Sequence, residues 1–405
     1  MNHESTAPMT ASSTKVLSYR WVILAICTLN FLMSFIDRLA WANLSLSVSE
    51  SMGLPLSTLG AYLTSFYVGY VAFNALGGLL SDKLGARMVL IISMLSLGVF
   101  TGLFGFTHTF GQGLALQLFM GFAAGADFAC CVKLIVTWFD KGSRGRAMGL
   151  FMIASSLGVV VTNLLVPTLA EAVGWRNVYH ILGIVTFGLG ILSIFLLRDG
   201  PVDNAPAPLK AVIKLMRNRN VLFLTLAGFG GFWGTWGFAF WANTLLIKHE
   251  GFSPVEAGGI VSLAGIAAIF GKPAFGLLSD WIRNPKLIAV LCLLFFSAML
   301  VVFGQLQGRT AFLIGAPLIG LGAFVYSPLL AVMVGEIAGA KHAGSATGLT
   351  AAIWQLASVI VPVAVGFVFQ STGSFTVAFS VLAAGPLFGA IMLICLKVAP
   401  AKISD

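Results

Sequence analysis

Apolar segments long enough to cross a membrane recur along the whole chain. About 20 apolar residues in a helix span the hydrocarbon core of a bilayer, where only helices and closed barrels satisfy every backbone group. The sequence therefore predicts an all-α membrane protein with twelve transmembrane helices. The expected spans are residues 20–45, 56–80, 87–107, 111–138, 145–172, 175–197, 220–247, 254–279, 287–305, 310–335, 344–370 and 375–397.

Charged residues are too few for a protein whose main solvent is water. They make up 9% of the chain, whereas soluble domains carry about 25%. The net charge of +9 could suggest nucleic-acid binding, but the basic residues gather in alternate loops, with only Arg176, Lys248 and Arg309 in the others. Loops rich in lysine and arginine stay in the cytoplasm. We therefore expect both termini in the cytoplasm and no nucleic-acid partner.

The pentapeptide Gly-Leu-Leu-Ser-Asp occurs twice, at 78–82 and at 276–280. Such duplication predicts two pseudo-symmetric six-helix bundles, an arrangement typical of secondary transporters whose halves rock about a central site. The predicted domains are a cytoplasmic N-terminal tail (1–19), a first bundle (20–197), a cytoplasmic linker (198–219), a second bundle (220–397) and a cytoplasmic C-terminal tail (398–405).

The first copy of the pentapeptide, with the residues up to Arg87, resembles the loop signature of the major facilitator superfamily, and the second copy resembles its counterpart. The resemblance covers the whole chain and implies the fold of that family. In the family, the motif aspartate contacts the N-terminus of a neighbouring helix, where the helix dipole favours an anion. Asp82, Arg87 and Asp280 are therefore expected to act in gating; a simple cytoplasmic stop signal is the alternative.

Residues 35–38, Phe-Ile-Asp-Arg, resemble a first-span element of the anion:cation symporter family. Tyr70 falls where those proteins carry a tyrosine that faces the solute. Ala124 stands where they have a glutamate, but Asp127 lies about one helical turn away and could take over the role of that carboxylate.

Residues 271–276 resemble a span-eight element of monocarboxylate and oxalate transporters, in which an arginine binds the solute carboxylate. In this chain the basic residue is Lys272, a point charge without the planar fork of arginine. The resemblance implies that Lys272 binds the solute. The alternative is that its side chain snorkels towards the cytoplasm.

Other charged residues also lie inside predicted spans, where each costs about 2.5–3.5 kcal/mol to insert, so function is the default interpretation. Arg38 can grip a carboxylate through two nitrogens, or it could form a structural pair with a neighbouring acid. Asp37 and Asp127 are expected to carry a coupled proton, with a structural ion pair as the alternative. Lys133 is expected to snorkel to the nearby interface.

Polar and aromatic residues in the spans suggest the rest of a substrate cavity. The candidates for substrate binding are Tyr67, Tyr70, Asn74, Tyr326, Trp354 and Gln355. Trp233 and Trp236 lie among the glycines of span seven and are expected to form an outer gate. Packing is the alternative role for each of these aromatic residues.

Together these features predict a secondary transporter that imports a small organic anion, a carboxylate, by proton-coupled symport. An exporter or antiporter of a small organic solute, or a solute sensor of transporter descent, is the alternative. No enzyme motif, metal-ligand spacing or cofactor motif is found in the sequence. The expected partners are the anion, protons and membrane lipids. A monomer in the inner membrane of a bacterium is expected.

Overall fold

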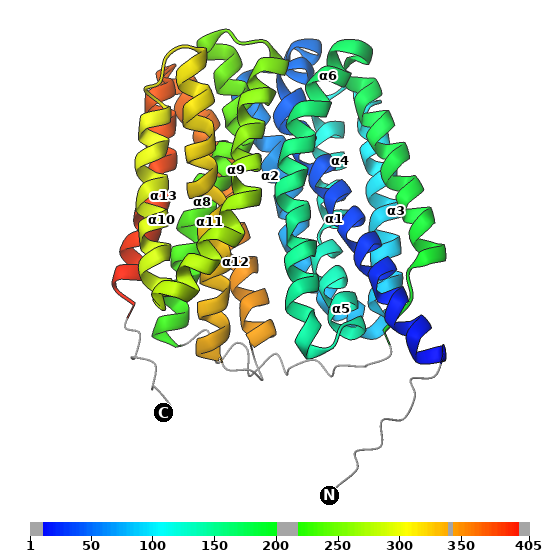
Figure 1. The fold of residues 1–405 in the computed structure, drawn as a ribbon. Coiled ribbons are helices and arrows are strands. Elements are labelled where there is room, and N and C mark those ends of the chain that lie inside the picture. Colours follow the sequence, from blue (N-terminus) through cyan, green and yellow to red (C-terminus); the bar gives the residue numbers. More distant parts are fainter. Residues whose placement is uncertain (1–10, 201–217, 339–342, 397–405) are drawn as a thin grey trace, which may run out of the picture.

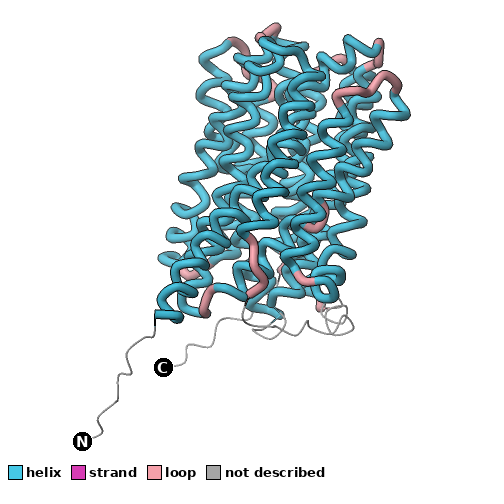
Figure 2. Tube along the Cα trace, turned by 90° about the vertical axis from the view of Figure 1, so that its right-hand side faces the viewer, coloured by secondary structure: helices cyan, strands magenta, loops and turns pink. Residues whose placement is uncertain are grey.

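The structure is a computed structural model that describes residues 11–200, 218–338 and 343–396. Within these residues the secondary structure is helical, and the helices run from one end of the molecule to the other with loops at the two ends (Figure 2). The prediction of an all-α membrane fold is confirmed.

The helices form two groups that stand side by side (Figure 1). The first group contains α1 (Ala11–Met52), α2 (Leu56–Leu84), α3 (Ala86–Phe104), α4 (Phe110–Ala124), α5 (Asp127–Trp138) and α6 (Lys141–Leu196). The second contains α8 (Arg219–Glu250), α9 (Pro254–Ile282), α10 (Pro285–Phe303), α11 (Arg309–Ala338), α12 (Ala343–Thr372) and α13 (Phe375–Ile394). We call them the first and second halves.

A broken helix pair and a kinked helix relate these elements to the predicted spans. Helices α4 and α5 share the expected span 111–138 and are separated by a turn at Gly125. Helix α6 contains two expected spans, joined at Gly174, whose φ of 79° is a left-handed value that favours glycine. Ten helical stretches of the described residues are long and apolar enough to cross a membrane. This is consistent with twelve crossings, which stay a prediction.

Close contact between α2 and α4 positions the centre of the first half. A Cβ atom added at Gly121 would lie 1.9 Å from the carbonyl oxygen of Phe66, and one at Gly125 would lie 2.7 Å from that of Tyr70. Only glycine permits such an approach, which is a common device in membrane helices. Tyr70 on α2 and Asp127 at the start of α5 are thereby brought to the same region.

The two halves meet through polar contacts at one end of the molecule. Helix α1 begins and α13 ends at the terminal end, and we call the opposite end the distal end (Figure 1). Towards the distal end, the side-chain nitrogen of Asn243 in the second half donates to the side-chain oxygens of Asn43 (2.9 Å) and Asn163 (2.7 Å) in the first. We call these three residues the distal amide contact. Lys248 also pairs with Glu50 across the halves, at 3.5 Å.

The domain division stays a prediction. Helix α1 begins at Ala11, inside the predicted tail 1–19. Most of the predicted linker 198–219 and the predicted tail 398–405 lie outside the described residues.

Candidate functional site

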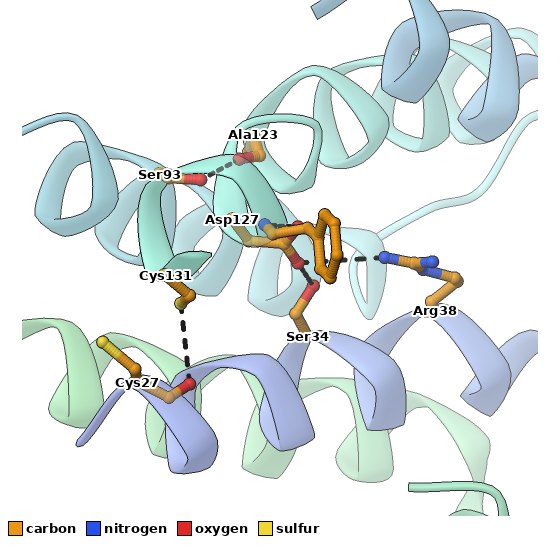
Figure 3. A network of polar contacts seen from close by, with 8 residues as sticks. Cys27, Ser34, Arg38, Ser93, Ala123, Asp127 and Cys131 are labelled. Atoms are coloured by element: carbon orange, nitrogen blue, oxygen red, sulfur yellow. Dashed lines mark hydrogen bonds and ion pairs between the residues drawn. The ribbon is translucent and has the colours of Figure 1, made fainter. Parts of the chain in front are cut away.

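A buried ion pair lies near the middle of the first half. Arg38 on α1 and Asp127 at the start of α5 approach to 3.8 Å, and their side chains are 1% and 0% exposed. Ser34, one turn before Arg38, donates its hydroxyl to one carboxylate oxygen of Asp127, and the backbone N–H of Phe128 is donated to the other (Figure 3). Both carboxylate oxygens are therefore held, and the pair satisfies the rule that buried charges are partnered.

Arg38 keeps unused hydrogen-bonding capacity. Its Nε atom is buried without a hydrogen-bond partner, and its Nη2 atom, which lies 3.8 Å from the Asp127 carboxylate, is too far from it for a hydrogen bond. Its guanidinium carbon lies 4.6 Å from the ring centre of Phe35, 4.4 Å from that of Tyr70 and 6.0 Å from that of Trp236. Aromatic rings stabilise a cation weakly and accept no strong hydrogen bond. The arginine is thus held in place by Asp127 and the rings while donors stay available.

Aromatic residues from both halves surround this arginine. Trp236 on α8 lies 6.2 Å from Phe35 and 5.8 Å from Tyr67 between ring centres, and Phe240 lies 5.3 Å from Tyr67. The hydroxyl of Tyr67 and the indole nitrogens of Trp236 and Trp354 are buried without a hydrogen-bond partner. Because native proteins pair nearly all buried polar groups, these atoms are candidates to contact a bound solute.

Lys272 on α9 reaches the first half at a different point. Its ammonium donates to the hydroxyl of Ser155 on α6 at 3.0 Å. Ser155 lies one turn before Gly158, where an added Cβ would be 2.7 Å from the Cβ of Phe35. Lys272 therefore touches the helix face against which Phe35 packs. Among the side chains that the structure describes, no carboxylate forms an ion pair with Lys272.

The two acids predicted to carry a proton lie in different surroundings. Asp37 precedes Arg38 but points to another side of α1, where the hydroxyl of Thr186 on α6 donates to it at 2.7 Å. Its second carboxylate oxygen is buried without a partner. Only Asp127 lies beside Arg38.

The two tryptophans predicted to form a gate face different halves of the molecule. Trp233 donates its indole N–H to the carbonyl of Val381 on α13, at 3.1 Å, and therefore packs inside the second half. Trp236, three residues later, faces Phe35 and Tyr67 of the first half.

The remaining candidates of the second half contact other residues of that half. The hydroxyl of Tyr326 on α11 pairs with that of Thr235 on α8, at 3.0 Å. Trp354 on α12 lies 5.6 Å from Phe232 between ring centres. The side-chain oxygen of Gln355 accepts from Ser358 one turn later, at 3.3 Å.

In the first half, Asn74 lies on α2 one turn after Tyr70, beside the turn between α4 and α5. A Cβ added at Gly125 would be 3.0 Å from its backbone nitrogen. Asn74 is therefore close to the start of α5, which carries Asp127.

The predicted gating residues lie near the terminal end. The backbone N–H of Arg87 donates to Asp199 at 3.2 Å, and its guanidinium donates to the carbonyl of Ile194 at 2.8 Å. Arg87 therefore joins the start of α3 to the end of α6. The side chains of Asp82 and Asp280 lie outside those described. Lys133, expected to snorkel, donates to the carbonyl of Ser81 at 2.9 Å.

Several functional candidates were absent from the sequence-based prediction: Ser34, Ser155, Thr186 and the asparagines of the distal amide contact. A search for polar residues inside apolar segments would have found them, because each lies in a predicted span. No group of three or more histidine, cysteine or acidic residues in the described part of the chain could hold a metal ion.

Residues 26–362 match the family model of the Major Facilitator Superfamily. The chain belongs to this superfamily. The resemblance found in the sequence is thereby confirmed, and the family is one of membrane transporters and not of enzymes.

Curated relatives of similar length are transporters of organic anions. The chain is 28% identical to a protein of Cupriavidus necator named as a probable sulfoacetate transporter, over 95% of each chain. It is 24% identical to the hexuronate transporter of Bacillus subtilis, over 89% of this chain and 91% of the relative.

Solved structures show the same fold. A bacterial homologue of the human lysosomal transporter Spinster, in an inward-facing and unoccupied conformation, superposes with a TM-score of 0.78. The match covers 95% of this chain and 99% of that structure at 15% identity, so it supports the fold alone.

Proposed function

We propose that this chain is a secondary transporter that takes up a small organic anion, a carboxylate, together with a proton, by alternating access. The observation that carries the proposal is Arg38, a buried arginine whose Nε lacks a hydrogen-bond partner and whose Nη2 meets Asp127 only at 3.8 Å. Guanidinium groups bind carboxylates through paired hydrogen bonds. The names of the relatives, which include sulfoacetate and hexuronate transporters, support an anionic solute.

Asp127 is the residue that we assign to the coupled proton. It competes with an incoming anion for Arg38, because both are negative and the pair distance is only 3.8 Å. Protonation of Asp127 removes that competition and frees the guanidinium for the anion. Proton and anion would therefore bind together. Asp37, whose carboxylate meets Thr186 elsewhere in the first half, remains a second candidate for a proton.

The orientation follows from the distribution of charge. Basic residues concentrate in the loops of the terminal end, and such loops remain in the cytoplasm. We therefore place the terminal end, with both chain termini, in the cytoplasm of a bacterium, and the distal end outside its inner membrane. In this arrangement the distal amide contact closes the outer side of the central site.

Uptake by proteoliposomes tests this function. The purified protein is first screened for thermal stabilisation by carboxylic acids, and the best ligand is then used in radiolabelled form. We expect accumulation that is driven by an inward proton gradient and abolished by a protonophore. Accumulation that is unaffected by the protonophore would contradict symport with protons. Binding that survives in both Arg38→Ala and Lys272→Ala would contradict the site.

A further inference from the structure

The break between α4 and α5 interrupts the backbone hydrogen bonds of this part of the first half. In a continuous helix, each N–H donates to the carbonyl four residues earlier. Among the described residues, the N–H groups of Asp127 and Phe128 make no such bond. The pattern resumes with the N–H of Cys130, which donates to the carbonyl of Ala126 at 3.0 Å. Because Ala126 and Asp127 are 0% exposed, the interrupted groups do not face water.

Two side chains bind the backbone groups that the break leaves free. Ser93 on α3 is buried and donates its hydroxyl to the carbonyl of Ala123, the acceptor that the N–H of Asp127 would use (Figure 3). The carboxylate of Asp127 accepts the N–H of Phe128. A buried backbone group without a partner is costly, and a side chain that inserts into the helical ladder can break a helix. Ser93 and Asp127 therefore stabilise the broken form.

We propose that Ser93 is a positioning residue for the carboxylate that carries the coupled proton. Through its bond to Ala123, it keeps the helix broken at the place where Asp127 reaches Arg38 and Ser34 on α1. Without this hydroxyl, the carbonyl of Ala123 would regain the N–H of Asp127. The helix would then close, and the carboxylate would turn away from Arg38. This inference rests on the proposed function and adds a residue that the function does not assign.

The surroundings of the carboxylate explain why its position matters for proton binding. The titratable or charged side chains near it come from α1, α2 and α5: Arg38, Tyr67, Tyr70 and Cys131. Only Arg38 among them is charged at neutral pH. An opposite charge favours the ionised carboxylate, and an anion bound to Arg38 cancels that effect. Proton uptake on anion binding therefore requires Asp127 to lie beside Arg38, the arrangement that the break provides.

Calorimetry in buffers of different ionisation enthalpy tests the proposal. It uses the full-length protein and the carboxylate that stabilises the parent most in the thermal screen. The parent should take up about one proton per anion, so its affinity should rise about tenfold per unit decrease in pH. Ser93→Ala should take up about half as many protons or fewer and lose most of this pH dependence. A Ser93→Ala protein with the proton number and pH dependence of the parent would overturn the proposal.

The affinity at alkaline pH separates positioning from a general loss of stability. A damaged site would bind the anion more weakly at every pH. Closure of the helix instead removes Asp127 as a competitor for Arg38, so Ser93→Ala should bind the anion more tightly than the parent at alkaline pH. Weaker binding at every pH would show that Ser93 has only a structural role.

Matched variants complete the test. Ser93→Thr keeps the hydroxyl and should keep the proton number of the parent. Ser297→Ala is the control, because Ser297 on α10 also donates to a carbonyl of a neighbouring helix, that of Ala383 at 2.8 Å, but α13 is unbroken there. It should leave proton uptake unchanged. If Ser93→Ala does not fold, Ser93→Cys, whose thiol is a weak donor, should show the same loss of proton uptake, and uptake equal to that of the parent would overturn the proposal.

The outcome also distinguishes this inference from the function on which it rests. If the parent takes up no proton when the anion binds, the proposed coupling through Asp127 is wrong. If the parent and Ser93→Ala both take up one proton, the coupling stands and only the role of Ser93 is wrong.

Discussion

Two of the places where the halves meet differ in charge. In the distal amide contact, neutral side chains are joined by bonds of 2.9 and 2.7 Å, and the side-chain oxygen of Asn243 is buried without a hydrogen-bond partner. In the central site, Arg38 and Lys272 are charged, and the Nε of Arg38 and the indole nitrogen of Trp236 are buried without a hydrogen-bond partner. Hydrogen bonds between neutral amides stabilise one arrangement of the halves by a modest amount. Charged groups with unused donors are suited to a ligand that brings its own charge.

The largest effect on anion binding is expected from substitution of Arg38, the arginine of the central site. Arg38→Gln should weaken anion binding at least ~30-fold, because truncating one partner of a buried charge pair costs about 2–5 kcal/mol. It should also lower the melting temperature, since Asp127 stays buried without its cation. Calorimetric titration and thermal unfolding measure the two effects.

Two further variants separate binding from stability. Arg38→Gln combined with Asp127→Asn should regain stability without regaining binding. Arg176→Gln, at an arginine that donates to the carbonyl of Thr107 at 2.8 Å, should bind the anion normally. An Arg38→Gln protein that binds like the parent would show that the guanidinium does not hold the anion.

A smaller effect, on the arrangement of the two halves, is expected from substitution in the distal amide contact. Asn243→Ala removes both bonds of the distal amide contact, at about 1 kcal/mol each, so the equilibrium should shift roughly thirtyfold towards separation of the distal ends. Spin labels at Val173 and Val255, which are partly exposed near the distal end, would report the distance between the halves. The exposed Cys395 is first replaced by serine.

Asn177→Ala is the matched control for this change. Asn177 is exposed and donates within its own helix, to the carbonyl of Val173 at 2.7 Å. The Asn177→Ala substitution should leave the distribution of distances between the spin labels unchanged. If Asn243→Ala also leaves the distribution unchanged, the distal amide contact does not hold the halves together.

The smallest effect compares two buried hydroxyl groups that both lack a partner, those of Tyr67 and Tyr62. Tyr67 lies against Trp236 of the second half, whereas Tyr62 packs against Trp41 and Phe104 of the first. Tyr67→Phe should weaken anion binding about fivefold, the value of one hydrogen bond of about 1 kcal/mol. Tyr62→Phe should leave binding unchanged. Equal effects in titrations of the two variants would exclude a contact between Tyr67 and the anion.

Much of this fold could be predicted from the sequence, because hydropathy is a local property. The apolar segments can be recognised in the sequence by their hydropathy. Arg38 and Asp127 stand out because a charged residue inside a membrane-spanning segment is costly. The direction in which each side chain faces is set by non-local packing, which hydropathy does not report. Asp37 is adjacent to Arg38 in sequence yet meets Thr186 on another helix.

The same limit applies to the tryptophans of α8. Trp233 and Trp236 belong to one aromatic segment, but only the packing of α8 against α13 and α1 decides which half each one faces. Likewise, the asparagines of the distal amide contact are more than 70 residues apart from one another. Their pairing depends on how the halves are placed together.

The most direct test of the central site is the number of protons taken up when the anion binds. It is obtained by calorimetry in buffers of different ionisation enthalpy, at a pH where the anion itself is fully ionised. The parent protein should take up about one proton per anion, and Asp127→Asn should take up none while still binding the anion. No proton uptake by the parent, or equal uptake by Asp127→Asn, would contradict the exchange of Asp127 for the anion at Arg38.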